Sequence, residues 1–280
     1  ASFDTHRAQG EKEGDPYIAV GGLPAAVVAS IGLGPSGYPF FGSDTGGYRH
    51  APTDKELFTR WFEHTALSSV MQIGTNSNDV AWEYLPENGF DDEMLGWYRD
   101  YTRLHLRLFP YEWTYAQAIA DTGHPIQRAT GLAYPELGEH PTYDYLFGED
   151  LLVAPVVERG ATTRDVLVPP GTWVHWFTGE AFEGPGHHVV DAPLGRLPLF
   201  QRQGSVVPML RPTVDTLAPA TVEGVDSFAN RAGTLWVRTI PGEPHTFELY
   251  DGSKVGQDFG EAGLSLTWSA GDVFDDGAIF

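Results

Sequence analysis

An aromatic pair followed by a glycine-bounded turn, Phe40-Phe41-Gly42-Ser43-Asp44-Thr45-Gly46-Gly47, gives the clearest indication of the fold. Aromatic residues favour an extended backbone, and the paired glycines let the chain turn with positive φ. Asp44 is therefore predicted to lie where a strand over residues 38–43 ends and a loop begins. In a barrel of alternating strands and helices the C-terminal end of a strand binds substrate, and the alternative is that Asp44 only caps the next turn.

The residues around this stretch predict an alternation of helices and strands. Thr53 and Glu56 form a capping box ahead of an amphipathic helix, and Pro110 is expected to interrupt a later one. The predicted elements are a helix at 23–30, a strand at 38–43, a helix at 54–68, a strand at 70–74 and a helical pattern over 91–120. This order is typical of a parallel α/β layer.

The rest of the chain is predicted to be rich in β-structure. Short aromatic and β-branched runs suggest strands at 164–169, 172–178, 180–183 and 187–191, and again at 235–240, 245–250 and 264–268. Turns are expected at Pro169-Pro170-Gly171 and Thr178-Gly179. The adjacent His187 and His188 would point to opposite faces of a strand, so no metal site is predicted there.

Four collinear motifs resemble those of the family thirty-one glycoside hydrolases, the α-glucosidase and α-xylosidase family. They lie at residues 37–47, at 56–62, at 104–111 with 124–128, and at 147–156. The resemblance implies an α/β plus all-β fold: the C-terminal part of a (β/α)8 barrel, then a β-sandwich domain and the start of a second. The implied domains are 1–135 for the barrel segment, 136–212 for the proximal β-sandwich domain and 213–280 for an incomplete distal β-domain.

The family's two catalytic aspartates are expected upstream of residue 1. Neither a Trp-x-Gly-Asp acid/base segment nor an Asp-Met-Asn-Glu-like nucleophile segment occurs in the 280 residues. Phe3-Asp4 resembles the pair that follows the acid/base in the family. The resemblance thus implies a retaining α-glycosidase whose N-terminal half, on the same or a separate chain, completes the barrel. We expect this chain alone to be inactive.

The resemblance also implies a sugar pocket. Asp44 would bind sugar hydroxyls, and Phe41 and Trp82 would form apolar walls. The amides of Asn76 and Asn78 and the carboxylate of Asp79 would take the place of a histidine that the family usually has in this loop. The predicted substrate-binding residues are Asp44, Phe41, Trp82, Asn76, Asn78 and Asp79. The alternative is an ordinary polar loop with Trp82 in the core. Because residues 74–83 contain no Lys or Arg, a neutral sugar is favoured over a uronate or a sulfonated sugar.

Composition excludes several classes of function. A net charge of −21 disfavours partnership with nucleic acid or an anionic membrane, and no apolar run of 18 residues suggests a membrane span. No cofactor or metal is predicted, and cytoplasmic and secreted locations and homo-oligomerisation stay open. The expected ligand is an oligosaccharide or glycoside. The alternatives are a non-catalytic carbohydrate-binding or scaffold chain, and a transglycosylase or lyase of the same fold.

Overall fold

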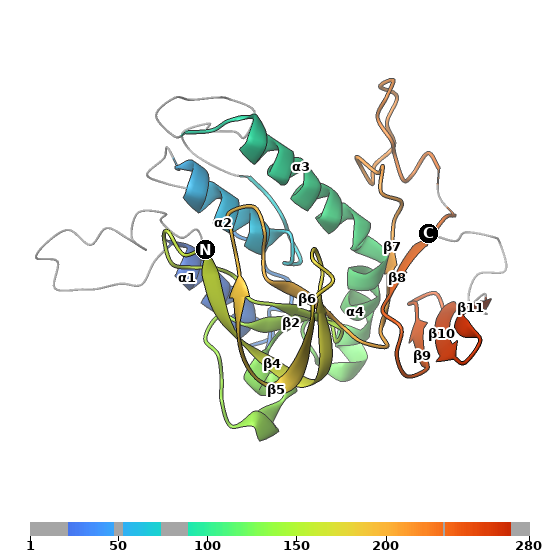
Figure 1. Ribbon diagram of the computed structural model, residues 1–280. Helices are drawn as coiled ribbons and strands as arrows, with labels where there is room; N and C mark the ends of the chain where they lie inside the picture. Colours follow the sequence, from blue (N-terminus) through green and yellow to red (C-terminus); the bar gives the residue numbers. More distant parts are fainter. Residues whose placement is uncertain (1–21, 48–52, 74–88, 232, 270–280) are drawn as a thin grey trace, which may run out of the picture.

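The computed structural model describes residues 22–47, 53–73, 89–231 and 233–269. Its N-terminal part is helical, with α1 (Gly22–Leu33), α2 (Lys55–Thr65), α3 (Asp92–Arg107) and α4 (Phe109–Thr122). Figure 1 shows α2 and α3 running along one side of the molecule, with the strands beneath them. The helices at 23–30 and 54–68 predicted from sequence correspond to α1 and α2.

The amphipathic pattern of α2 explains its packing, but its predicted cap was wrong by one residue. Trp61 and Phe62 are fully buried in the main core. Asp54, not Thr53, is the N-cap, because its side chain accepts a hydrogen bond of 2.9 Å from the backbone N–H of Leu57. The Thr53 hydroxyl instead donates to the carbonyl of Gly46 at 2.7 Å, so it ties the Asp44 turn to the start of α2.

The long helical pattern over 91–120 is divided, as predicted. The break falls at Leu108, between α3 and α4, so that Pro110 occupies the first turn of α4. Proline lacks a backbone N–H and fits only where no intrahelical bond is needed. The proline therefore sets the start of a new helix rather than a kink within one.

The two predicted barrel strands are present only as a single parallel bridge, between Asp44 and Gln72. Residues 38–43 and the described residues 70–73 form no regular strand. The Phe41 N–H donates at 2.7 Å to the hydroxyl of Ser69 rather than to a backbone carbonyl. The strand prediction was therefore too long, although the parallel direction was right. Side-chain hydrogen bonding here replaces one rung of the expected ladder.

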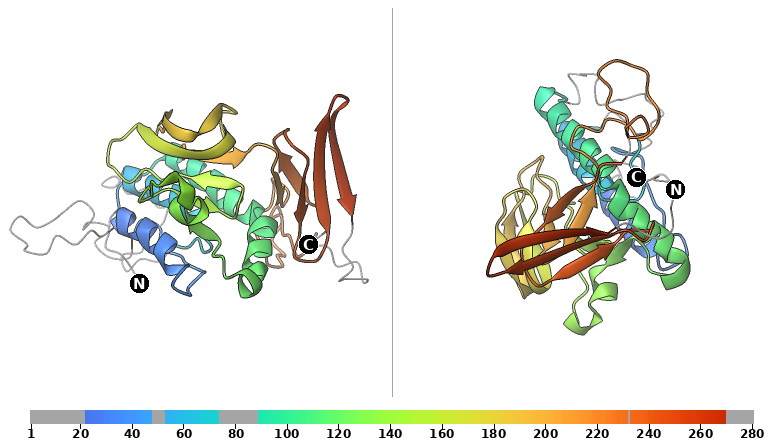
Figure 2. Two further views of the ribbon diagram at one scale, coloured as in Figure 1. Left: turned by 90° about the horizontal axis from the view of Figure 1, so that it is seen from below. Right: turned by 90° about the vertical axis from the view of Figure 1, so that its right-hand side faces the viewer.

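Antiparallel strands form a six-stranded sheet after the helices. The order is β1-β2-β3-β6-β4-β5. The strands are β1 (Gln127–Ala129), β2 (Tyr145–Phe147), β3 (Leu151–Val153), β4 (Thr163–His175), β5 (Ala181–Asp191) and β6 (Leu199–Arg202), and two short helices, α5 (Thr130–Ala133) and η1 (Pro135–Leu137), lie between β1 and β2. Figure 2 shows β4 and β5 curving over the face that the helices do not cover.

A bulge replaces the turn predicted at Pro169-Pro170-Gly171. The register between β4 and β5 shifts between Val168 and Gly171, but the two strands remain paired on either side. The predicted strands at 164–169 and 172–178 are therefore one strand, and those at 180–183 and 187–191 are another. The Trp173 indole N–H donates to the carbonyl of Pro169 at 3.1 Å, which satisfies a carbonyl beside the bulge. The turn predicted at Thr178-Gly179 does join β4 to β5.

Two smaller sheets complete the C-terminal part. Strands β7 (Val206–Met209) and β8 (Trp236–Thr239) form a pair. Strands β9 (His245–Glu248), β10 (Lys254–Gly260) and β11 (Gly263–Ser269) form a three-stranded sheet at one end of the molecule. Phe247 of β9 stacks on Tyr111 of α4 with ring centroids 5.5 Å apart. The described residues beyond η1 contain no helix, which agrees with the predicted change to β-structure. The domain boundaries remain a proposal.

Candidate functional site

Asp44 lies at the end of the bridged segment, as the sequence predicts. The N–H of Thr45 donates to the carbonyl of Gln72 at 2.9 Å, and the N–H of Gly47 donates back to the carbonyl of Asp44 at 2.8 Å. Gly46 and Gly47 have φ values of +85° and +91°. These left-handed conformations suit glycine, so the chain turns away directly after the carboxylate.

Side chains around Asp44 alternate between two faces. Ser43 accepts a hydrogen bond of 2.9 Å from the indole N–H of Trp61, and the hydroxyls of Thr45 and Thr65 are 3.0 Å apart. Both contacts are with α2. Because successive residues of an extended segment point to opposite faces, Asp44 faces away from α2. In a barrel, substrate-binding residues lie at the C-terminal ends of the strands, and Asp44 lies at the corresponding end of the bridged segment.

Gln72 is a partner of Asp44 that sequence reasoning missed. Its amide Nε2 donates to Asp44 Oδ1 at 3.0 Å, while Oδ2 has no hydrogen-bond partner within the described residues. Burial raises the pKa of Asp44 above its usual value, and the hydrogen bond from Gln72 offsets part of this increase. The parallel bridge brings the two residues together, and no local sequence pattern signals it. Among the described residues, one oxygen is thus left to accept hydrogen bonds from a hydroxyl-bearing ligand.

The other predicted site residues are only partly described. Phe41 is 8% exposed. It lies two and four positions before Ser43 and Thr45, so its side chain is on the same side of the extended segment, the side that faces α2. Phe40, which is 54% exposed, lies four positions before Asp44 and so on the same side of the extended segment. The role of Phe41 as a wall of the sugar pocket stays a prediction. Trp82, Asn76, Asn78 and Asp79 lie outside the described residues.

Close approach of the two bridged segments requires Gly42. A Cβ atom at this position would meet Val70, with its Cβ at 2.6 Å and its carbonyl oxygen at 2.7 Å. These separations are well below van der Waals contact, so any side chain here would push the segments apart. Gly42 therefore keeps Asp44 in register with Gln72.

The second motif, on α2, forms a buried junction with the six-stranded sheet. Arg60 pairs with Glu63 at 3.1 Å and also donates to the carbonyls of Ala161 at 2.9 Å and Ala192 at 2.7 Å. Glu63 accepts from the N–H of Gly195 at 2.9 Å. Burial raises the pKa of Glu63 to about 7, while Arg60 lowers it in opposition. Arg60 and Glu63 therefore hold the six-stranded sheet against α2, whereas Trp61 of the same motif contacts Ser43, next to Asp44.

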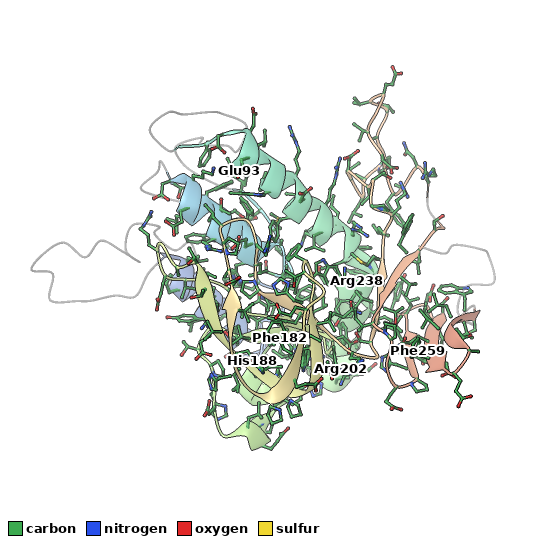
Figure 3. The ribbon with its side chains drawn as sticks, viewed as in Figure 1. Glu93, Phe182, His188, Arg202, Arg238 and Phe259 are labelled. Atoms are coloured by element: carbon green, nitrogen blue, oxygen red, sulfur yellow. The ribbon has the colours of Figure 1, made fainter. Side chains whose placement is uncertain are left out.

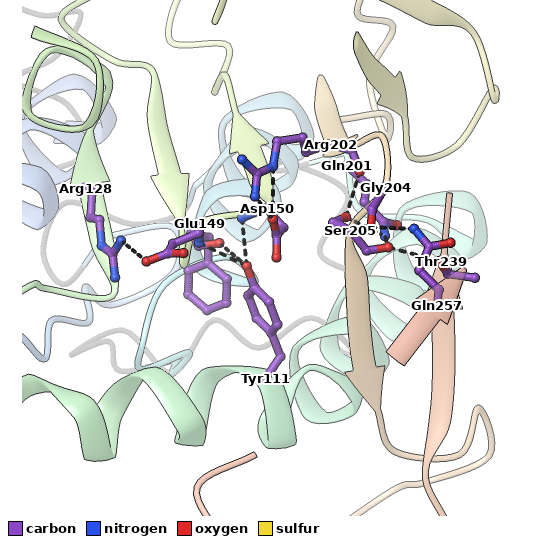
Figure 4. A network of polar contacts seen from close by, with 11 residues as sticks. Tyr111, Arg128, Glu149, Asp150, Gln201, Arg202, Gly204, Ser205, Thr239 and Gln257 are labelled. Carbon is purple, nitrogen blue, oxygen red and sulfur yellow. Dashed lines mark hydrogen bonds and ion pairs between the residues drawn. The ribbon is translucent and has the colours of Figure 1, made fainter. Parts of the chain in front are cut away.

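The fourth motif is also structural (Figure 4). The Tyr111 hydroxyl accepts from the backbone N–H groups of Glu149 at 3.2 Å and Asp150 at 3.0 Å, and it donates to the carbonyl of Phe147 at 3.0 Å. Arg202 donates to Asp150 through Nη2 at 2.9 Å. The turn at residues 147–150 is thereby held between α4 and β6.

The described residues contain no cluster of three or more His, Cys, Asp or Glu side chains able to hold a metal ion. They also contain no helix that is long and apolar enough to cross a membrane.

The described residues form helices joined by one parallel bridge, followed by antiparallel β-sheets, and Asp44 lies at the end of the bridged segment. Comparison with protein families identifies the family of this chain. Residues 6–115 match the glycosyl hydrolases family 31 TIM-barrel domain, and residues 123–207 match the glycosyl hydrolase family 31 C-terminal domain. The chain belongs to glycoside hydrolase family 31.

Curated relatives include enzymes with different substrates. The chain is 35% identical over 191 residues to a sulfoquinovosidase of Escherichia coli, an alignment covering 66% of this chain and 27% of the relative. It is 29% identical over 233 residues to alpha-glucosidase 2 of Bacillus thermoamyloliquefaciens, covering 82% and 28%. It is 31% identical over 210 residues to an isomaltosyltransferase of Sporosarcina globispora, covering 70% and 19%.

Solved structures agree on the fold. A cycloalternan-forming enzyme of Listeria monocytogenes aligns with a TM-score of 0.72 at 26% identity, covering 87% of this chain and 24% of that one. An alpha-xylosidase of Xanthomonas citri aligns with a TM-score of 0.70 at 25% identity, covering 89% and 29%. The chain thus spans less than a third of the length of each of these relatives.

Proposed function

We propose that this chain forms one wall of the sugar-binding pocket of a retaining α-glycosidase. The observation that carries the proposal is Asp44, at the end of a parallel segment, where Gln72 donates to one carboxylate oxygen and the other has no hydrogen-bond partner among the described residues. A free carboxylate oxygen accepts hydrogen bonds from sugar hydroxyls. Its negative charge also stabilises the positive charge that develops on the sugar ring during cleavage.

Retaining cleavage needs two carboxylates about 5–5.5 Å apart, one as nucleophile and one as acid/base. The family segments that carry both are absent from the 280 residues. In the proposal, the nucleophile attacks the anomeric carbon while the acid/base protonates the leaving oxygen. Water then hydrolyses the glycosyl-enzyme intermediate. Asp44 would stabilise both oxocarbenium-like transition states without itself forming a bond to carbon.

Asp44→Asn in the enzyme that carries this chain tests this role. We expect kcat/KM on an aryl α-glycoside to fall by about a hundredfold to a thousandfold, because the charge acts mainly in the transition state. Asp121→Asn, on the exposed face of α4, is the matched control and should leave kcat/KM unchanged. Full activity in Asp44→Asn would show that Asp44 only stabilises the turn and does not contribute to catalysis.

The substrate is proposed to be a neutral α-linked sugar, since residues 74–83 contain no Lys or Arg to bind an acidic substituent. The likeness to a sulfoquinovosidase makes a sulfonated sugar the competing substrate. Comparing kcat/KM for aryl α-glucoside, α-xyloside and α-sulfoquinovoside decides between them. A preference for the sulfonated glycoside would overturn the neutral-sugar proposal while leaving the glycosidase proposal intact.

Transglycosylation is a second candidate function, favoured by the similarity to an isomaltosyltransferase. Product analysis with a disaccharide donor separates the two: glucose alone indicates hydrolysis, and longer oligosaccharides indicate transfer. The purified 280-residue chain should show neither activity, because it lacks both catalytic segments. Turnover by this chain at an enzyme-like rate would contradict that expectation.

A further inference from the structure

A cavity of about 310 Å³ lies between α3 and the turn that joins β4 to β5. Its lining residues are Asp100, Tyr101, Arg103, Leu104, Arg107, Trp176, Phe177 and Pro212. None of them belongs to the segment around Asp44 and Gln72. The volume lies at the lower end of the range for pockets that hold small ligands.

The aromatic side of the cavity is held in place. The backbone N–H of Trp176 donates to the carbonyl of Leu199 at 2.7 Å, and the guanidinium carbon of Arg238 lies 3.9 Å from the centre of the indole ring. Arg238, labelled in Figure 3, also donates to the carbonyl of Trp176 at 2.9 Å. The orientation of the indole is therefore fixed before any ligand arrives, which lowers the entropic cost of binding.

Phe177 extends the aromatic surface towards solvent. Its side chain is 45% exposed, and its backbone N–H donates to Nδ1 of the buried His175 at 3.2 Å. The ring lies 6.0 Å from the ring of Tyr101 on α3. An exposed aromatic ring beside a cavity with polar walls is suited to stacking on the apolar face of a pyranose.

The polar side of the cavity carries both donors and acceptors. Arg107 donates through Nε to the carbonyl of Leu210 at 3.4 Å, and its terminal nitrogens have no acceptor within the described residues. Arg103 is paired with Asp215 at 3.1 Å. Asp100 supplies carboxylate oxygens from the same helix, one turn before Arg103 and two turns before Arg107. Sugar hydroxyls need such a mixture, because each both donates and accepts.

We propose that this cavity is a binding site for a neutral saccharide, with Phe177 stacking on a sugar ring and Arg107 and Asp100 bonding its hydroxyls. An anionic ligand fits less well. Asp100 lines the cavity, Asp215 already pairs with Arg103, and the chain carries a net charge of −21. The site would hold part of a longer glucan, apart from the sugar unit that contacts Asp44.

Affinity electrophoresis of the enzyme that carries this chain, in gels with and without a soluble α-glucan, tests the proposal. Phe177→Ala should weaken retardation by the glucan about tenfold, because the stacking surface is lost. Phe259→Ala is the matched control: Phe259 is 50% exposed on β10 and lies outside the cavity. Arg107→Gln should also weaken retardation, whereas Arg99→Gln, exposed on the same helix, should not.

Activity on a small aryl α-glycoside is measured in parallel and should be the same in Phe177→Ala as in the wild type. This activity also shows that each variant is folded. A lack of activity in the wild type would contradict the proposed function and not the saccharide site. Equal retardation of Phe177→Ala and Phe259→Ala would overturn the proposal. So would an absence of retardation in the wild type, or binding of inorganic phosphate that depends on Arg107 without binding of glucan.

Discussion

The segment around Asp44 and the junction around Arg60 are close in the sequence but differ in how their polar groups are used. At Arg60 the terminal nitrogens bond a carboxylate and backbone carbonyls, and the side chain is 4% exposed. At Asp44 one carboxylate oxygen has no partner within the described residues, and Phe40 beside it is 54% exposed. A polar group that is buried and bonded supports the fold, whereas one that is left unbonded is available for a ligand.

Arg60→Ala should separate the two regions most clearly. We expect it to lower the free energy of unfolding by about 3–5 kcal/mol, because Glu63 would be left buried without its partner. Asp44→Asn, by contrast, should change activity and leave the unfolding free energy almost unaltered. Urea unfolding of both variants, with exposed Arg99→Ala as control, measures the difference. The double replacement Arg60→Met with Glu63→Leu should recover much of the stability; equal losses in Asp44→Asn and Arg60→Ala would contradict the distinction.

A second test concerns the glycine of the fourth motif. Gly148 has φ of +67°, and a Cβ there would overlap the hydroxyl of Tyr111. Gly123, with φ of +69°, has nothing within 4 Å of such a Cβ. Both alanine variants should lose about 1–2 kcal/mol from the left-handed backbone, and Gly148→Ala should lose more through steric overlap with Tyr111. Thermal or urea unfolding measures both, and equal losses would show that Tyr111 moves aside freely.

A smaller effect is expected from pH at the β4–β5 turn. His175 accepts backbone N–H bonds from Phe177 and Thr178 through Nδ1, which requires this nitrogen to be unprotonated. Burial, and secondarily Arg196, lowers the pKa of His175 to about 4. Since an unfolded histidine has a pKa of about 6.5, the folded state binds fewer protons between these values. The stability from this group is present above pH 6.5 and is lost as pH falls towards 4.

His175→Asn isolates this contribution, because an amide oxygen can accept the same bonds without titrating. Between pH 7 and 5 the wild type should lose about 1–2 kcal/mol of unfolding free energy relative to the variant. If the unfolding free energy depends on pH in the same way in both proteins, protonation of His175 is not linked to folding. The change at the turn would also be felt by Phe177, which lines the proposed saccharide site.

Local sequence was sufficient to predict helices α1 to α4 and the family. The apolar periodicity of α2 and the proline at the start of α4 act within one or two turns of chain, so they can be recognised without knowing the rest of the fold. The turn after Asp44 is similarly local, because Gly46 and Gly47 permit it directly. The order and spacing of the four motifs are likewise properties of the chain itself, and they are specific enough to indicate glycoside hydrolase family 31.

What those motifs do depends on contacts that only the folded chain makes. Arg60 reaches carbonyls more than a hundred residues away, Gln72 meets Asp44 across a parallel bridge, and Tyr111 fills the turn at Gly148. The Pro169-Pro170-Gly171 segment became a bulge because β5 pairs on both sides of it. Such contacts join residues distant in the sequence. Local propensity cannot specify them, since their free energy is gained only when both partners are already in place.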